Sequence, residues 1–467
     1  MMTPSKRKIV FVGKRTKNWA IGCEIASNLV KTRNEVLLCD LSRFSGIWRP
    51  ISLSRKRDQR RILSKFGIKS HRLKVGSPTL SIICLKKTIR ILQHGLDVYQ
   101  DSDLYRIVLC HYAGRYGTPE MDLKDVPKLS LFLTIYRFIT LQASCSNFLN
   151  SKQEFDSIYI FNGRELAEAT IISEIRKREF KIKIYERASN SNRFEIYDLS
   201  PHNNEEWWQK IANDSYATFD SLNQERKLAA KRYIQLKMNG IDPFTSTKWK
   251  DFLDSPVVEF PELPSRYVVF FSVSTSEFSP FPEYNSKAGF SNQFEALGEL
   301  MDVAKLNDIK VVVRRHPNSI GRDRIDREVA YWKPFLSESS VVYFPPTSRV
   351  NSYDLAEKSL STFTWRSTIG FDMLCRGKPS FAMGPAKWAL DNRLRIWDRK
   401  SIEMVLQEDY IFPNVADLIE QYSFYMANFG ENLEEFDFIE RWGYKLKNQK
   451  ERRNYMLQRI LGIPSAI

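Results

Sequence analysis

The stretch IKVVVRRHPN, residues 309–318, joins a run of valines to a turn that carries arginine, histidine and proline. Three successive valines are typical of a strand that is buried on both faces of a parallel sheet. Pro317 ends the strand, because its ring fixes the backbone and removes a hydrogen-bond donor. Ligands of parallel α/β sheets bind just beyond the carboxyl ends of the strands. We therefore expect an α/β fold in which this turn aims Arg314 and His316 at a binding site.

The side chains of this turn suit an anionic ligand. Arginine supplies a planar fork of donors for phosphate or carboxylate. Histidine can donate a hydrogen bond to an anionic leaving group or bind it as imidazolium. The alternative is a salt-bridged turn with a structural histidine.

The residues on both sides of the stretch alternate between strand and helix patterns, as in domains with a parallel sheet. Further strands are predicted at residues 267–273, 341–344, 360–364 and 380–383. Helices are predicted at residues 292–306, 352–358 and 368–376, and Gly377 is a suitable cap for the last one.

The first half of the chain repeats this alternation. Strands are predicted at residues 8–13, 35–40, 104–109, 157–161 and 180–185. Helices are predicted at residues 19–31, 129–141 and 205–238, and another ends near residue 177. Four prolines between the halves indicate a domain boundary. We predict a first domain at 1–240, a linker at 241–265, a second domain at 266–412 and a helical tail at 413–467.

A second polar motif follows the strand predicted at 360–364. Ser367 or Thr368 can cap the next helix, and the free amide groups of a helix N-terminus attract phosphate oxygens. Gly370 would let a ligand approach the backbone closely. Asp372 could accept hydrogen bonds from ribose hydroxyls. The alternative is an ordinary capped helix.

A third motif lies in the first half, where Asn162, Gly163 and Arg164 follow one predicted strand and Glu186 and Arg187 follow the next. Glu186 is a candidate general base that would deprotonate an acceptor hydroxyl. The two arginines are candidates for binding an acidic acceptor or a diphosphate. The alternative for Glu186 is an internal ion pair with arginine that holds two loops together.

Composition narrows the classes of partner and the location. Lys and Arg number 71 against 55 Asp and Glu, a net charge of +16 that attracts phosphate-rich partners, nucleic acid or an anionic membrane surface. The six cysteines are scattered, so we expect reduced thiols rather than a disulfide framework. No apolar run reaches the roughly 20 residues of a membrane-spanning helix. We expect a cytoplasmic protein that is soluble or attached peripherally to the inner face of the cell membrane.

Several other motifs are absent from the sequence. The residues after the first strand lack the glycine spacing of a Walker loop and of a dinucleotide fingerprint. No paired histidines or cysteines form a metal-binding set, no Gly-flanked nucleophilic serine occurs, and no nucleic-acid module is recognisable. Nucleic acid is therefore not the partner that we expect.

Together, residues 311–318 and 367–379 resemble the C-terminal domain of bacterial capsule and surface-polysaccharide biosynthesis proteins, which are similar to GT-B glycosyltransferases. The family pattern runs from a strand through Arg-any-His-Pro to Ser-Thr-any-Gly-any-acid and Gly-Lys-Pro. Its counterparts here are Arg314, His316, Pro317, Ser367, Thr368, Gly370, Asp372, Gly377, Lys378 and Pro379. The motifs at 161–164 and 186–187 resemble the acceptor side of related proteins.

This resemblance implies two Rossmann-like domains that face each other across a cleft, with C-terminal helices that cross back to the first domain. The second domain would bind a nucleotide-sugar substrate through Arg314, His316, Asn318, Ser367, Thr368, Gly370 and Asp372. The first domain would bind a glycan or lipid-linked glycan acceptor through Asn162, Arg164 and Arg187. Glu186 and His316 would be catalytic, and no cofactor or metal is implied.

The implied activity is transfer of a sugar from the nucleotide-sugar to a hydroxyl of a growing surface polysaccharide. One alternative is a polyol-phosphate transferase of teichoic-acid-like polymer synthesis, which resembles the same fold and is favoured by aspartate at position 372. Another is a non-catalytic binding or assembly protein that has kept the fold.

Overall fold

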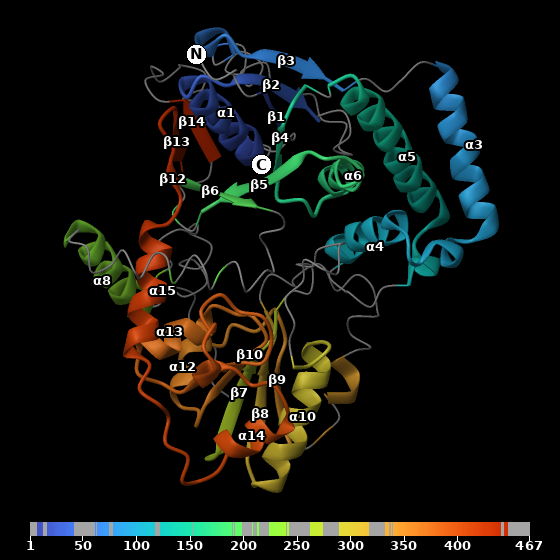
Figure 1. Cartoon of the computed structure of the whole chain (residues 1–467). Coiled ribbons are helices and arrows are strands. Elements are labelled where there is room, and N and C mark those ends of the chain that lie inside the picture. Colours follow the sequence, from blue (N-terminus) through green and yellow to red (C-terminus); the bar gives the residue numbers. More distant parts are fainter. Residues whose placement is uncertain are drawn as a thin grey trace, which may run out of the picture.

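The computed structural model describes residues 7–12, 16–41, 61, 63–73, 78–116, 122–152, 154–188, 190, 192–198, 208, 213, 224–239, 241, 262–273, 289–316, 332–335, 338, 340–439 and 443–446. In these residues, two large β-sheets are each accompanied by helices (Figure 1). The α/β class predicted from the sequence is therefore confirmed.

The first sheet has seven strands in the order β12-β6-β5-β4-β1-β2-β3. Its strands are β1 (Arg7–Val12), β2 (Glu35–Asp40), β3 (Lys69–Arg72), β4 (Ser157–Phe161), β5 (Lys181–Arg187), β6 (Arg193–Asp198) and β12 (Glu431–Asn432). Strands β1 to β5 are parallel, whereas β6 and β12 are antiparallel to their neighbours. The strand order 3-2-1-4-5-6 is that of a Rossmann fold. Strands β2 and β3 are added on one side of β1, and β4 to β6 on the other side, so the strand order reverses between β1 and β4.

Helices cover both faces of this sheet because its central strand is apolar on both sides. Ile9 and Phe11 of β1 belong to a core with the layer of α4, α5 and α6, whereas Val10 and Val12 belong to a core with α1. The helices of this half are α1 (Thr16–Lys31), α3 (Pro78–His94), α4 (Asp103–Tyr116), α5 (Lys128–Asn150) and α6 (Leu166–Ile175), with 3-10 turns η1 (Leu96–Tyr99) and η2 (Leu123–Asp125).

The second sheet has five parallel strands in the order β11-β10-β7-β8-β9. They are β7 (Tyr267–Phe271), β8 (Lys310–Arg314), β9 (Val341–Phe344), β10 (Thr362–Thr364) and β11 (Ser380–Ala382). This is again the 3-2-1-4-5 order, here with the reversal between β7 and β10. Its helices are α10 (Gln293–Leu306), α12 (Ser352–Glu357), α13 (Ile369–Cys375) and α14 (Arg399–Val405), with η5 (Asn392–Leu394).

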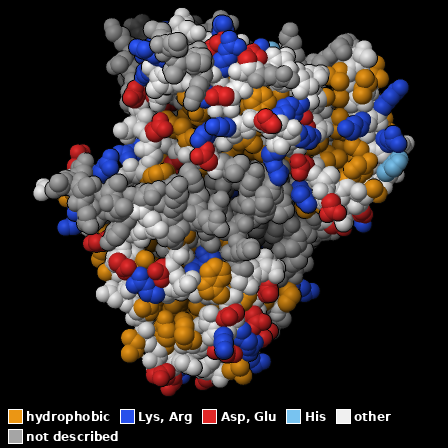
Figure 2. Space-filling view, viewed as in Figure 1, with side chains coloured by type: hydrophobic (Ala, Val, Ile, Leu, Met, Phe, Trp, Pro, Cys, Tyr) orange, Lys and Arg blue, Asp and Glu red, His pale blue; other side chains and the backbone are white. Residues whose placement is uncertain are grey.

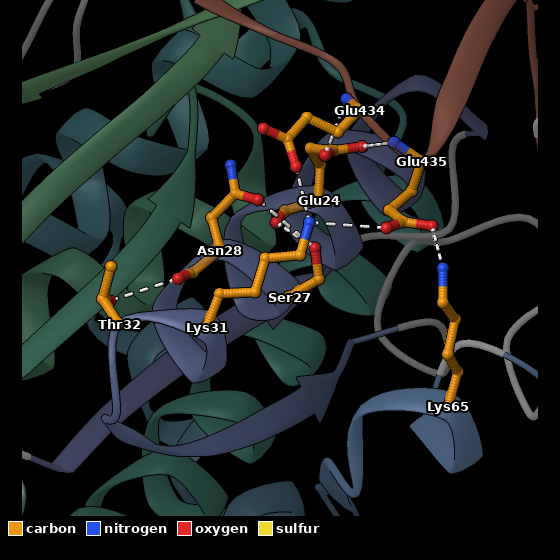
Figure 3. Close-up of polar contacts among 8 residues, drawn as sticks. All are labelled: Glu24, Ser27, Asn28, Lys31, Thr32, Lys65, Glu434 and Glu435. Atoms are coloured by element: carbon orange, nitrogen blue, oxygen red, sulfur yellow. Dashed lines mark hydrogen bonds and ion pairs between the residues drawn. The ribbon is translucent and has the colours of Figure 1, made fainter.

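The end of the described chain returns to the first sheet. Helix α15 (Ala416–Asn428) lies beside α8 (Gln224–Met238), and β12 then pairs with β6 (Figure 1). The hairpin of β13 (Phe436–Ile439) and β14 (Gly443–Leu446) follows. At its start, the buried carboxylate of Glu24 on α1 accepts hydrogen bonds from the backbone N–H groups of Glu434 and Glu435, at 2.8 and 2.9 Å (Figure 3).

One prediction of secondary structure is wrong, and a second is met only in part by the described residues. Residues 104–109 lie in helix α4 rather than in a strand, because Leu104, Ile107 and Val108 are buried at helical spacing. In the described part of the tail, α15 ends at Asn428 and β12 to β14 follow, while residues 440–442 and 447–467 of the predicted helical tail lie outside the described residues. Gly430 has a φ of 98°, and an added Cβ would lie 2.7 Å from the carbonyl oxygen of Phe194, so glycine lets the chain turn closely against β6.

Further expectations concern the thiols and the membrane. All six cysteines are free, and four of them are buried, as expected. None of the helices in the described ranges has the length and the apolar character needed to cross a bilayer.

Candidate functional site

Arg314 is the last residue of β8, and it is only 1% exposed. Its guanidinium donates hydrogen bonds to the carbonyl oxygens of Pro345 and Ser348, at 2.6 and 3.1 Å. Burial lowers the pKa of this guanidinium to about 10, so it stays charged at neutral pH. The side chain therefore fixes the turn that follows β9, and its predicted contact with donor phosphate stays a prediction.

His316 lies two residues beyond β8 and is half-buried. Its backbone N–H donates to the hydroxyl of Ser272 at 3.2 Å, and Ser272 follows the neighbouring strand β7. The N–H of Ser272 donates in turn to the carbonyl of Arg314 at 3.2 Å. These bonds hold the ends of β7 and β8 together and keep His316 at the carboxyl edge of the sheet. Pro317 and Asn318 lie outside the described residues.

The Ser-Thr motif follows β10, on the other side of β7. The hydroxyl of Ser367 accepts a hydrogen bond from the N–H of Ile369 at 3.5 Å. Thr368 occupies the N-cap position of α13, is exposed and makes no capping bond with its side chain. Ser367 and Thr368 therefore stand at the start of α13, as predicted, and serine rather than threonine bonds to its first turn.

Gly370 is a glycine for a different reason from the one that we inferred. An added Cβ would lie 2.3 Å from a ring atom of Trp388, so the indole, and not a ligand, occupies the space beside the backbone. The indole N–H of Trp388 also donates to the carbonyl of Ser367 at 3.1 Å. Trp388 thereby fixes the first turn of α13.

The two motifs of the second sheet meet at one edge. Strands β8 and β10 run parallel to β7 on its two sides, so their carboxyl ends point the same way. Two strand spacings separate them, roughly 10 Å. Ser272, His316 and Ser367 therefore follow adjacent strand ends at the point where the strand order reverses, which is where ligands bind in such sheets.

Asp372 lies in the first turn of α13, and its side chain is buried. One carboxylate oxygen lies 3.3 Å from the ammonium of Lys237 on α8, and the other accepts a hydrogen bond from the Tyr353 hydroxyl at 2.7 Å. Both charged side chains are buried. The predicted contact of Asp372 with a ribose hydroxyl stays a prediction.

The motif of the first sheet forms a chain of hydrogen bonds. Arg164 donates through Nε to the amide oxygen of Asn162 at 2.7 Å, and the amide nitrogen of Asn162 donates to Glu186 at 2.9 Å. Asn162 and Gly163 both have left-handed backbones, with φ values of 54° and 78°. Such a conformation is costly for asparagine and is often found at functional sites. The motif follows β4, at the reversal point of the first sheet.

Arg187 ends β5 and is half-buried. The structure thus brings Asn162, Arg164 and Glu186 together through these two hydrogen bonds, and it places Arg187 next to Glu186 along the same strand.

Sequence analysis missed Glu195, which lies directly opposite Glu186 in the antiparallel pair of β5 and β6. Burial raises its pKa to about 7, the charge of Lys387 lowers it, the charge of Glu186 raises it and a hydrogen bond with Tyr425 lowers it. The alternating pattern RFEIYD at 193–198 was the available signal, because a strand there would have placed a second acid beside Glu186.

The loop after β11 approaches both sites. Lys387 acts electrostatically on Glu195 of the first sheet, while Trp388 contacts Ser367 and Gly370 of the second. Arg366 also donates to the carbonyl of Pro385 in this loop at 2.9 Å. One short loop thus carries a charge that acts on Glu195 of the first sheet and an indole that packs on the Ser-Thr motif of the second.

Comparisons with known proteins give structural matches only. No protein-family model and no curated protein matches the chain. It is similar to KpsC, a beta Kdo 2,4 transferase of Thermosulfurimonas dismutans, with a TM-score of 0.36 and 13% identity over 58% of this chain and 79% of that one.

Two further structures match over most of the chain. The S. aureus MnaA–UDP structure has a TM-score of 0.29 and 10% identity over 92% of this chain and 93% of that one. UDP-GlcNAc 2-epimerase of Methanocaldococcus jannaschii, bound to UDP-GlcNAc and UDP, has a TM-score of 0.30 and 9% identity over 89% and 97%. At such values, the role of each residue has to follow from this chain's own geometry.

Proposed function

We propose that this protein is a glycosyltransferase of the GT-B type, which moves a sugar from a nucleotide-sugar to a hydroxyl of a growing surface polysaccharide. One observation carries the proposal. Each of its two Rossmann-ordered sheets has a predicted polar motif at the strand end where the order reverses: Asn162 to Arg164 in the first sheet, and Ser367 in the second. In this proposal, residues 1–240 bind the acceptor and residues 266–412 bind the donor.

The donor side would act on the charge that develops on the leaving phosphate. Breaking the bond between the anomeric carbon and the phosphate oxygen leaves its electron pair on that oxygen. His316, as donor or imidazolium, and the hydroxyls of Ser367 and Thr368 would stabilise this charge. Donors held in place in advance lower the barrier because they need little rearrangement during the reaction. Arg314 would contribute by holding the turn beside His316.

The acceptor side would supply the base. Glu186 takes the proton of the acceptor hydroxyl while the oxygen of that hydroxyl bonds to the anomeric carbon. The amide of Asn162 holds one oxygen of Glu186 and so orients the carboxylate. Arg164 and Arg187 would bind an acidic acceptor. Glu195, opposite Glu186, adds a second carboxyl group, and the charge of Glu186 raises its pKa.

The experiment combines binding with product analysis. A thermal-shift screen with cytidine-, uridine- and guanosine-linked sugars should raise the melting temperature with one class of donor, because a ligand of the folded state stabilises it. Mass spectrometry of the product should then show one added sugar. An added polyol phosphate would instead support the teichoic-acid-like alternative, and donor binding without turnover would support a binding protein.

His316→Ala should reduce turnover by about 100-fold or more, while the melting temperature of the protein without ligand stays unchanged. We expect the variant to fold, because His316 is only half-buried. Ser291→Ala, in the same half, is a matched control that should keep full activity. A fully active His316→Ala protein would contradict this role.

A further inference from the structure

Helices α3 and α5 form the outer layer of the first half, and they expose unusually many aliphatic side chains. Ile82 and Ile83 on α3 are 54% and 55% exposed, and Leu129 at the start of α5 is 72% exposed. The other exposed members are Leu85, Ile89 and Leu133. Figure 2 shows hydrophobic side chains gathered over these two helices. We call these six residues the outer apolar patch.

Helical spacing makes this patch a second apolar face rather than scattered contacts. The buried face of α3 consists of Cys84, Thr88 and Ile91, which pack toward the core. Ile82, Leu85 and Ile89 stand at positions i, i+3 and i+7 and form an exposed stripe of their own. A helix on the surface of a globular protein usually carries polar residues on that side.

The charged residues on the two helices of the patch are all basic, whereas acids such as Asp122 and Asp125 lie in the turn before α5. The sequences of α3 and α5 contain no aspartate and no glutamate. Lys86, Lys87 and Arg90 of α3 and Lys128 of α5 are exposed among the apolar residues. The acid that comes soonest after α3 in the chain, Asp97, pairs with Lys124 at 2.8 Å. Lysine and arginine side chains also line the outer edge of the patch in Figure 2.

We propose that the outer apolar patch binds the surface of an anionic lipid bilayer. Aliphatic side chains would enter the boundary between headgroups and acyl chains, while the lysines and arginines reach the anionic headgroups. A second copy of the chain is a poor partner, because it would bring like charges together. The charge of the whole chain, +16, favours the same surface. This proposal does not depend on the proposed enzymatic activity.

The test is flotation of the full chain with vesicles of phosphatidylcholine alone or mixed with phosphatidylglycerol. The protein should float with the anionic vesicles only, and binding should weaken as salt rises. Lys86→Gln combined with Arg90→Gln should weaken binding about 30-fold. Lys305→Gln combined with Lys400→Gln removes two exposed charges from the second half and should have little effect.

A second pair of variants tests the apolar part. Ile82→Ser combined with Ile89→Ser should weaken vesicle binding about tenfold. The matched control is Leu306→Ser combined with Ile411→Ser, at two exposed positions of the second half. Circular dichroism and melting temperature should be unchanged in all four proteins, because every substituted side chain is exposed.

Three outcomes would overturn the proposal. They are a wild-type protein that stays unbound with anionic vesicles, equal binding to neutral vesicles, and patch variants that float like their controls. Sedimentation velocity adds a further check: a dimer that the Ile82 and Ile89 substitutions abolish would assign the patch to a second copy instead.

Discussion

Glu195 carries a buried carboxyl group whose pKa is raised to about 7, chiefly by burial. In the unfolded chain this group ionises near pH 4.5. Between these two pH values, the folded state therefore binds a proton that the unfolded state has lost. The free energy of unfolding should fall as pH rises through this window, by about 3 kcal/mol in full. Below pH 4.5, both states hold the proton and the effect is absent.

Glu195→Gln should remove this slope, because an amide does not ionise. We expect the variant to be as stable as the wild type near pH 4.5 and more stable than it at pH 7.5. Urea unfolding at several pH values measures the difference. Glu338→Gln, at an exposed position of the second half, is the control and should leave the pH profile unchanged. Parallel profiles for wild type and Glu195→Gln would contradict the assignment.

Single residues also show which features of the site could be predicted from the sequence and which could not. The polar motifs at 162–164 and 367–368 were predictable because they follow apolar strands, and strand ends are where a parallel sheet exposes its ligand edge. The reason for Gly370 was not, because Trp388 lies 18 positions further along the chain. The inward bonds of Arg314 depend in the same way on a turn after another strand.

Helix α13 is tied to two other helices by one buried carboxylate. Asp372 pairs with Lys237 of α8 and accepts a hydrogen bond from Tyr353 of α12. Lys237→Met should lower the free energy of unfolding by about 3–5 kcal/mol, because it leaves a buried charge without its partner. Urea unfolding monitored by circular dichroism measures this loss.

The matched variant removes both charges. Lys237→Met combined with Asp372→Leu should recover most of the stability, since no uncompensated charge remains. Lys231→Met, at an exposed position on the same helix, is a control for the loss of a lysine from α8. A double variant as unstable as Lys237→Met would show that the pair itself, rather than the isolated charge, determines the loss.

Strands and helices with a clear hydrophobic pattern in the sequence were predictable. Elements that form only by pairing with residues far away in the sequence were not. Strands β2, β4 and β9 have the predicted bounds, because each is a short apolar run between polar turns. Helix α4 was taken for a strand because its apolar residues are close together in a short segment. Strand β12 has two residues and exists only because β6 offers an edge to pair with.

The whole molecule is joined by a chain that leaves the second sheet and returns to the first (Figure 1). The returning segment contacts Glu24, a residue of α1 with no exposed surface. Around it, Lys31 pairs with Glu434 at 2.6 Å and Lys65 pairs with Glu435 at 2.7 Å (Figure 3). These lysines are 39% and 59% exposed, so solvent screens the ion pairs and each contributes little. The two backbone bonds to Glu24 should contribute more.

Glu24→Ala should therefore destabilise the segment at residues 434–436 locally without unfolding either sheet. Losing two hydrogen bonds to a charged acceptor should lower the local stability by about 2–4 kcal/mol. Hydrogen exchange followed by mass spectrometry should show faster exchange at residues 434–436, while the amides of α13 stay protected. Glu35→Ala, which removes an exposed partner of Arg7, is the control and should change neither region. Unchanged exchange at 434–436 would mean that Phe436, packed edge-on against Trp19, holds the hairpin without the carboxylate.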